Sequence, residues 1–182
     1  MEIVAFNADT KADGTGTAGI TWISKNCVDK HEMNDSSVKE GGWAASEMRA
    51  WLQSEYYNTL PDDVKNTIVD VIKTYNECPR YSYSYSSSRV TKTCVDNIWI
   101  PSVHELFGDS DHYCERTGVT YTEYFNTTDS TKKSLGGATS TQMWSRTATL
   151  YNDTCTFWGI HGGFYAQYYA GMVLPFALGF CT

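Results

Sequence analysis

Basic clusters, long apolar runs and closely spaced cysteine pairs are all absent from this sequence. Its 21 Asp and Glu outnumber its 14 Lys and Arg, which gives a formal net charge of −7, and the only adjacent basic pair is Lys132–Lys133. Binding to nucleic acid or to an anionic membrane surface needs a basic patch, so the sequence argues against both. No apolar run approaches the roughly 20 residues that cross a bilayer, so we expect no membrane insertion.

Metal and disulfide frameworks also lack their usual signals. The 6 cysteines include no CxxC pair, which argues against structural zinc, and GDSDHYCE lacks the ligand spacing of a calcium loop. We therefore expect no metal and no cofactor. The first residues, MEIVAFNADTK, contain neither a basic nor an apolar signal region, which predicts synthesis in a reducing compartment. We expect mostly buried, reduced thiols.

What the sequence has in abundance is aromatic residues. They make up 14% of 182 residues, with 13 Tyr and 6 Trp, in a composition that is otherwise globular. This length suits one domain, which we assign to residues 1–182. Abundant Tyr, Ser, Gly and Asn is also typical of the binding loops of recognition proteins.

Two segments of the first half have helical periodicity. GGWAASEMRAWLQSEYYNTL repeats apolar residues at helical spacing and predicts a helix over about residues 45–57. In LPDDVKNTIVDVIKTYN, Pro61 suits a first helical position, and five later residues form one apolar face. This pattern predicts a second helix over residues 61–75. The five residues are Val64, Ile68, Val71, Ile72 and Tyr75.

Strand signals flank these segments. AGITWISK (18–25) alternates in the manner of a short strand, and NIWIPSVHELFG reads as a strand that leads into a short helix, with Ser102 and Glu105 at capping-box spacing. YSYSYSSS (81–88) suits a hairpin or a loop, and residues 108–142 suit a long loop. TCTFWGI, FYAQYY and MVLPFALGF predict short C-terminal strands around a Gly162–Gly163 turn. The sum is an α+β domain with two helices, a small antiparallel sheet and long loops.

Several strings together resemble a family of tail-associated proteins from phages and prophages of gut bacteria. They are ADGTGTAGITWISK, GGWAASEMRAWLQSEYYNTLP, DNIWIPSVHELFG, MWSRTA and LPFALGFC. The resemblance implies a C-type lectin-like fold, in the branch shared with formylglycine-generating enzymes. Some members are variable proteins of diversity-generating retroelements. A strand through residues 61–75 in place of the helix would count against this family assignment.

The resemblance implies a receptor-binding module in the virion tail, made in the bacterial cytoplasm, that contacts a protein or glycan on a bacterial surface. A homo-oligomer within the tail would fit that role. The exchangeable ligand-contact positions would be Thr147, Thr149, Tyr151, Asn152, Asp153, His161, Phe164, Tyr165, Gln167, Tyr168 and Tyr169. Adenine-directed mutagenesis cannot yield Gln167 or Met172, so either those two residues are scaffold or the gene is not diversified.

The aromatic run FYAQYY gives a separate argument from the residues alone. A strand exposes alternate residues, and this run has aromatic residues at both parities. One face can be buried, so some rings must lie outside, and a patch of exposed rings usually marks an interaction site. The competing interpretation is that the rings belong to the core of a strand pair.

Other functional readings remain open at this point. Arg146, in MWSRTA, is expected to be buried and paired with a carboxylate or with carbonyl groups. Cys155 and Cys181 could approach each other, as in an enzyme of formylglycine-generating type, although no neighbouring base is evident and we expect no enzymatic activity. A third alternative is a structural tail component without receptor contact.

Overall fold

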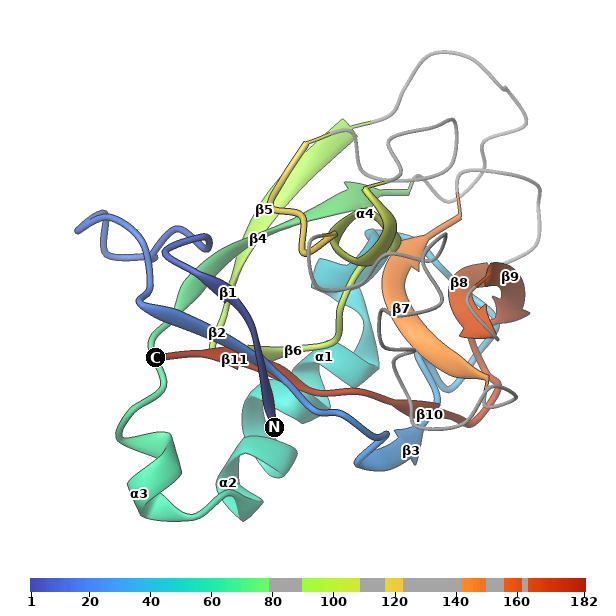
Figure 1. The fold of residues 1–182 in the computed structure, drawn as a ribbon. Helices are drawn as coiled ribbons and strands as arrows, with labels where there is room; N and C mark the ends of the chain where they lie inside the picture. The colour runs from blue at the N-terminus through green and yellow to red at the C-terminus, as the bar shows by residue number, and fades with distance from the viewer. Residues whose placement is uncertain (79–89, 109–116, 123–141, 150–155, 162–163) are drawn as a thin grey trace.

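The computed structural model describes residues 1–78, 90–108, 117–122, 142–149, 156–161 and 164–182 (Figure 1). Within them, strands form four small antiparallel sheets. The largest has the order β1-β2-β11-β6, so the last strand of the chain lies between an N-terminal strand and a central one. Their bounds are β1 Glu2–Phe6, β2 Ile20–Ile23, β11 Gly179–Cys181 and β6 Ile98–Trp99.

The other sheets have two or three strands. β3 (Asp29–His31) pairs with β10 (Leu174–Phe176), and β4 (Val71–Glu77) pairs with β5 (Val90–Asp96). The third has the order β7-β8-β9 and contains the segment that carries the predicted contact residues. Its strands are β7 Met143–Ala148, β8 Thr156–His161 and β9 Phe164–Tyr169.

One long helix covers the sheets. It runs for 13 residues through α1 (Glu47–Trp51), the π-helical turn η2 (Leu52–Tyr56) and α2 (Tyr57–Thr59), after the 3₁₀ turn η1 (Gly42–Ala45). It begins where the Ser46 hydroxyl accepts a hydrogen bond from the backbone of Arg49, which is an N-cap. The prediction of a helix over 45–57 is therefore confirmed, with a small shift in its bounds.

The predicted helix over 61–75 is wrong. Only α3 (Asp62–Lys65) is helical, and β4 then begins at Val71. The apolar residues of this segment fit either period. The strand is chosen because Val71, Lys73 and Tyr75 then point into the core together, and β-branched side chains pack well on a sheet.

The α+β class with a C-type lectin-like fold is likewise wrong. The described chain is mostly β, in several small antiparallel sheets, with one helix of 13 residues. Strand β4 takes the last five residues of the predicted second helix and pairs with β5, and these two strands are the longest in the described residues. A fold class that needs two helices against one sheet does not describe this arrangement.

Most of the short-range predictions are confirmed. β2 lies within 18–25, and β8 to β11 occupy the C-terminal segments that read as strands. α4 (Val103–Phe107) follows β6 and has the full capping box, because the Ser102 and Glu105 side chains each bond the other's backbone. The 81–88 stretch, the acidic GDSDHYCE stretch after its first residue Gly108, and the Gly162–Gly163 turn lie outside the described residues.

The core consists of indole and phenyl rings gathered from every sheet. Trp43, Trp99, Trp144, Phe157 and Phe176 are buried in one cluster with residues of the long helix. A second cluster lies between the β1–β2 hairpin, α4 and β8. No helix in the described part of the chain is both long and apolar enough to cross a membrane.

Candidate functional site

The predicted contact segment lies on β9, at the edge of the β7-β8-β9 sheet as far as the described residues show (Figure 1). β9 runs antiparallel to β8, with Tyr168 opposite Phe157, Gln167 opposite Trp158 and Tyr169 opposite Thr156. Because successive residues point to opposite faces, Tyr168 lies on one face of the sheet and its two neighbours on the other.

Tyr168 points inward. Its ring meets the Trp144 ring edge-on, with 6.2 Å between centroids, and it is partly buried against the main core. A Cβ atom at Gly159 would lie only 2.5 Å from the Tyr168 ring, so the glycine leaves the space that the ring occupies. Tyr168 is therefore a packing residue more than a contact residue.

Tyr169 points outward, with 54% of its surface exposed, and Ala166 and Gln167 are also exposed. The Met172 amide donates to the Tyr169 carbonyl (2.9 Å), and this turn presents the exposed side chains of Met172 and Val173 beyond the strand. We call Gln167, Tyr169, Met172 and Val173 the β9 surface. Adjacent aromatic residues on a strand were expected to place at least one ring at the surface. This expectation is confirmed for Tyr168 and Tyr169, because the first ring packs inward and the second is exposed.

Two of the predicted contact residues are not on this surface. Thr147 and Thr149 are fully buried, which corrects their assignment. The Thr147 hydroxyl accepts a hydrogen bond from the Val103 amide (3.0 Å), and the Thr149 carbonyl accepts one from Lys39 Nζ (2.8 Å). Thr147 is buried because every residue of β7 is buried, and Thr149 follows directly after that strand.

The remaining predicted residues cannot be placed as side chains. Tyr151, Asn152 and Asp153 lie outside the described residues. His161, Phe164 and Tyr165 are described only by their backbone, in the strand pairing of β8 with β9. Gln167, Tyr168 and Tyr169 are thus the predicted contact residues whose surroundings on β9 are visible.

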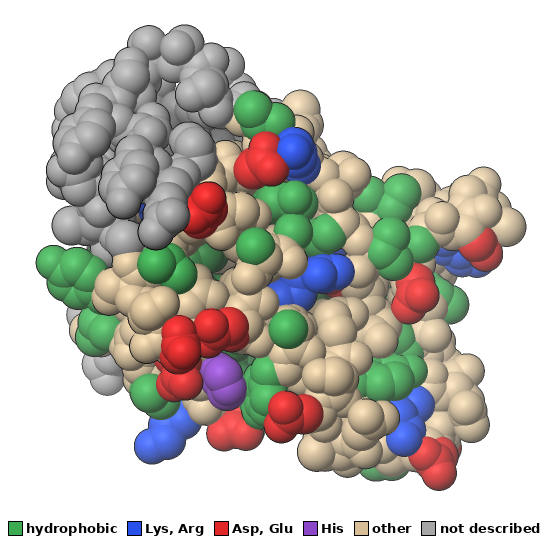
Figure 2. All heavy atoms as spheres, turned by 180° about the vertical axis from the view of Figure 1, so that it is seen from behind, with side chains coloured by type: hydrophobic (Ala, Val, Ile, Leu, Met, Phe, Trp, Pro, Cys, Tyr) green, Lys and Arg blue, Asp and Glu red, His purple; other side chains and the backbone are tan. Residues whose placement is uncertain are grey.

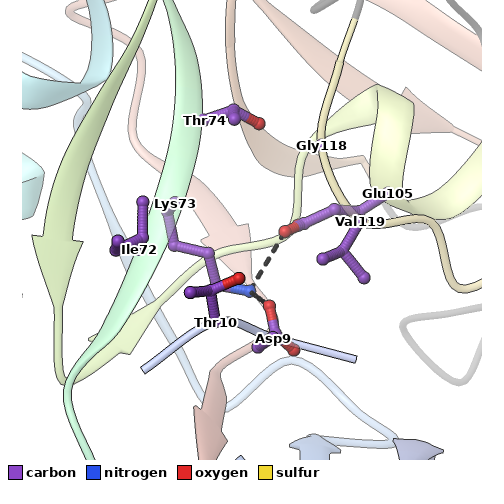
Figure 3. A pocket seen from close by; sticks show the side chains of 8 residues that line it. All are labelled: Asp9, Thr10, Ile72, Lys73, Thr74, Glu105, Gly118 and Val119. Carbon is purple, nitrogen blue, oxygen red and sulfur yellow. Dashed lines mark hydrogen bonds and ion pairs between the residues drawn. The ribbon is translucent and has the colours of Figure 1, made fainter. Parts of the chain in front are cut away.

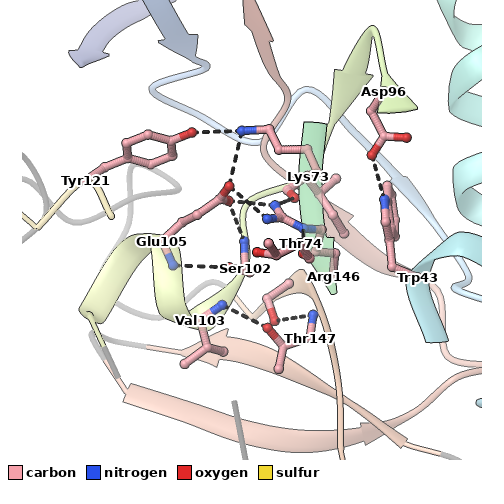
Figure 4. Close-up of polar contacts among 12 residues, drawn as sticks. Trp43, Lys73, Thr74, Asp96, Ser102, Val103, Glu105, Tyr121, Arg146 and Thr147 are labelled. Carbon is pink, nitrogen blue, oxygen red and sulfur yellow. Dashed lines mark hydrogen bonds and ion pairs between the residues drawn. The ribbon is translucent and has the colours of Figure 1, made fainter. Parts of the chain in front are cut away.

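Beneath this sheet lies a network of buried charges that the sequence reveals only in part. Arg146 of β7 is fully buried and forms two bonds with Glu105 of α4, Nη1–Oε2 at 2.6 Å and Nη2–Oε1 at 2.8 Å (Figure 4). It also donates to the carbonyls of Thr74 (3.2 Å) and Ile100 (2.9 Å). The expectation for Arg146 is confirmed.

Lys73 of β4 extends the network across the core. Its ammonium group donates to Asp9 (2.5 Å), Glu105 (3.1 Å) and the hydroxyl of Tyr121 (2.8 Å), and it lies 3.6 Å from the centre of the Trp99 ring. The Tyr121 hydroxyl in turn donates to Asp9. All three donors of the ammonium group are used, so its burial is compensated.

The electrostatics of the network favour its present protonation state. Burial raises the pKa of Glu105, but the charges of Arg146 and Lys73 outweigh burial and bring the pKa down to about 2. Burial and the carboxylates of Glu105 and Asp9 raise the pKa of the Tyr121 hydroxyl well above its ordinary value. Among the described residues, two carboxylates and two cations thus link β4, β7 and α4 to one another.

A pocket of about 320 Å³ opens beside this network (Figure 3). Its charged lining groups already bond to one another, since Lys73 joins Asp9 and Glu105 across the floor. The described lining residues therefore offer polar surface whose charges are already paired with one another. It is lined by Asp9, Thr10, Ile72, Lys73, Thr74, Glu105, Gly118 and Val119.

The cysteine chemistry of the alternative enzyme reading gains no support from Cys181. Its buried thiol lies 3.4 Å from the Thr21 hydroxyl and 3.5 Å from an oxygen of Asp9. Burial and the Asp9 carboxylate raise its pKa to about 12, whereas a reactive cysteine needs a lowered pKa. Cys155 lies outside the described residues. Among those described, no group of three or more His, Cys, Asp or Glu side chains could hold a metal ion.

Sequence reasoning missed Asp9, Lys73 and Tyr121 as partners in the network. The available signal was Lys73, which stands between Val71 and Tyr75 at strand spacing, where a buried position is expected. Its partners lie 64, 32 and 48 residues away along the chain, and no local pattern joins them.

Comparisons with known proteins add one result. No curated protein and no solved structure matches the chain. A family model, the domain of unknown function DUF6273, matches residues 18–171. This match includes the β7-β8-β9 sheet and every member of the charged network except Asp9. The chain belongs to the DUF6273 family.

Proposed function

We propose that this domain is a ligand-binding module whose contact surface is the β9 surface. Its ligand is a protein or a glycan on a bacterial surface, and its setting is the tail of a phage or prophage. Binding uses contact chemistry only: the Tyr169 ring stacks on an apolar or sugar face, and the Gln167 amide adds an orienting hydrogen bond.

The observation that carries the proposal is the contrast between two adjacent tyrosines. Tyr168 packs on Trp144, whereas Tyr169 stands 54% exposed beside the exposed Gln167 and Met172. Large apolar side chains that gather at the surface usually mark an interaction site. The strand that bears them is held from below by Trp144, whose own strand is anchored through Arg146.

Rigid support is what a contact surface of this kind needs. An aromatic side chain on a strand loses little conformational freedom when it binds, because few of its torsions remain to be fixed. The Met172–Tyr169 turn bond, together with the hydrogen bonds that the Met33 and Asn34 amides donate to the Ala170 carbonyl, holds the end of β9 in place. The surface is therefore preorganised, which favours affinity.

The phage-tail setting rests on the resemblance of the sequence strings alone. β4 occupies part of the segment where that resemblance would need a helix, so the lectin-like fold is no part of the proposal. The genes beside this one test the setting. Tail genes would support it, and a reverse transcriptase with a template repeat would also make the protein a diversified one.

The binding proposal is tested by labelling the purified domain and measuring its attachment to a panel of gut bacterial cells. Tyr169→Ala should weaken attachment by about 1–3 kcal/mol, as at aromatic hot spots of other interfaces. The matched control is Phe6→Ala, because Phe6 is also an exposed aromatic residue (66%, against 54% for Tyr169) and lies on β1, in another sheet. Equal attachment by both variants and the unaltered domain would reject the β9 surface.

A further inference from the structure

Three aromatic rings come together at the surface where β3 meets the long helix. The His31 ring stacks on the Trp51 ring with 4.3 Å between their centroids, and the Trp51 and Tyr56 centroids are 5.1 Å apart. Trp51 and Tyr56 both contact the buried Phe176 ring, which ties them to the core. Each of the three outer rings remains partly exposed. We call His31, Trp51 and Tyr56 the aromatic stack.

The π-helical turn η2 brings two of these rings to the same side of the helix. In a regular α-helix, residues five positions apart point about 140° away from each other, so Trp51 and Tyr56 would diverge. The wider π-helical turn, with its i→i+5 hydrogen bonds, places such residues nearly above one another. Turns of this kind are rare and are frequently found at functional sites. The contact between Trp51 and Tyr56 therefore depends on an unusual local geometry of the backbone.

Two carboxylates border the aromatic stack. Asp29 is two residues before His31 on β3 and shares its face of the strand. Burial raises the pKa of the Tyr56 hydroxyl and the charge of Asp29 raises it further, so this carboxylate lies near that ring. Glu47 precedes Trp51 by one helical turn and is exposed. Among the described residues, neither carboxylate forms an ion pair with a Lys or Arg, and Figure 2 shows Asp and Glu side chains around a histidine at the position of β3.

His31 adds a hydrogen-bond acceptor to this surface. Its Nδ1 atom lies 2.6 Å from the Glu32 carbonyl oxygen, which can only accept, so Nδ1 carries a hydrogen and donates it. The other ring nitrogen, Nε2, has no partner among the described residues and is an acceptor in the neutral ring. Aromatic faces also carry negative potential. The rings, the acceptor and the two carboxylates are therefore all complementary to one kind of group, a cation with N–H donors.

We propose that the aromatic stack, with Asp29 and Glu47, binds an arginine side chain of a partner protein. A guanidinium group stacks on aromatic rings, pairs with carboxylates and donates several hydrogen bonds in one plane, whereas a lysine ammonium group is a compact point charge. The formal net charge of −7 attracts a basic partner from a distance. This inference does not depend on the proposed function of the β9 surface.

Nuclear magnetic resonance of the full chain, titrated with a hexa-arginine peptide, tests the proposal. The indole N–H signal of Trp51, assigned by its loss in Trp51→Phe, should shift and reach saturation. A hexalysine peptide should bind at least about threefold more weakly, because its ammonium groups have the charge but cannot stack on the rings. This comparison uses the unaltered chain, so it is decisive even if a variant unfolds.

Two double variants separate this surface from the overall charge of the protein. Asp29→Asn with Glu47→Gln should weaken hexa-arginine binding at least about fivefold, because the arginine loses both carboxylates. The new amide groups can still accept the backbone hydrogen bonds that the carboxylates accept now. The matched control is Asp63→Asn with Asp70→Asn, which removes the same charge from exposed positions on and after α3 and should weaken binding by less than about twofold.

Any one of three results would overturn the arginine site. The first is a Trp51 indole signal that does not shift with hexa-arginine. The second is equal weakening of binding by the two double variants, which would mean attraction to net charge alone. The third is hexalysine binding as tight as that of hexa-arginine, which would leave the rings without a role. Loss of attachment to bacterial cells would reject the proposed function of the β9 surface alone.

Discussion

The Glu105 carboxylate binds the Arg146 guanidinium and also the backbone amide at the start of helix α4. Glu105 Oε2 accepts from Arg146 Nη1 at 2.6 Å and from the Ser102 backbone amide at 2.9 Å, inside the core. The same side chain therefore closes the capping box of α4 and anchors β7. Glu105 therefore connects the capping box of α4 to strand β7, and β7 supports β9 through the contact of Trp144 with Tyr168.

Removing one partner of this pair should be strongly destabilising. Arg146→Met leaves the Glu105 carboxylate buried beside one remaining cation, and the loss of a buried partner costs about 3–5 kcal/mol. Urea unfolding followed by fluorescence measures the free energy of unfolding. The double variant Arg146→Met with Glu105→Leu is the control and should lose less than the single variant. A single variant that loses under about 1 kcal/mol would mean that the pair is not buried as described.

The stability of the domain should fall steeply in acid because of Glu105. Its pKa is about 2 in the folded chain against 4.5 as the ordinary value, so the folded state holds fewer protons between these two pH values. The stabilisation is complete above about pH 4.5 and is lost as the pH falls toward 2, by about 3 kcal/mol in total. Urea midpoints across this range give the slope. Glu105→Gln should flatten it, and an unchanged slope would assign the acid loss to other groups.

Substitution of a buried lysine on β4 should cost more stability than substitution of an exposed lysine on the paired strand β5. Lys73 is buried with three partners, whereas Lys92 pairs with Glu77 at the surface. Lys73→Met should cost about 3–5 kcal/mol because two carboxylates lose their shared cation, and Lys92→Met should cost at most about 1 kcal/mol. The free energies of unfolding of the two variants test this directly. Equal losses of stability in the two variants would contradict the burial of Lys73 within the charged network.

The reactivity of the thiols should follow their pKa values. The pKa of Cys94 and that of Cys181 are both about 12, raised by burial and by nearby carboxylates, so roughly one thiol in ten thousand is ionised at pH 8. Cys27 is half-buried and its pKa is raised by burial alone to a smaller extent. Brief alkylation of the native protein, read by mass spectrometry, should label Cys27 before Cys94 and Cys181. Faster labelling of Cys181 would favour the enzyme alternative.

Features that depend on residues close together in the sequence could be predicted. Ser102 and Glu105 are three residues apart, and their capping box formed as expected. Tyr168 and Tyr169 are adjacent, and strand geometry alone required that one of them face outward. Arg146 is buried with carboxylate and carbonyl partners, as expected, although the sequence does not identify Glu105 as the carboxylate.

Features that depend on contacts between residues far apart in the sequence could not be predicted. Val71, Ile72 and Tyr75 fit a helix as well as a strand, whereas the strand brings Lys73 to Asp9 and Glu105, which are distant in the sequence. Thr147 looked like an exchangeable surface residue, yet its hydroxyl bonds the Val103 amide in the core. Such contacts join segments that are tens of residues apart, so the local periodicity of the sequence does not reveal them.

The two adjacent tyrosines of β9 provide the most direct test of the contact surface. Tyr168→Ala removes a ring packed on Trp144 and should lower the free energy of unfolding by about 2–4 kcal/mol, whereas Tyr169→Ala should change it by less than about 0.5 kcal/mol. Measured on the same samples, attachment to bacterial cells should fall for folded Tyr169→Ala. If Tyr169→Ala unfolds the domain, or keeps full attachment while folded, the outward face of β9 is not the binding surface.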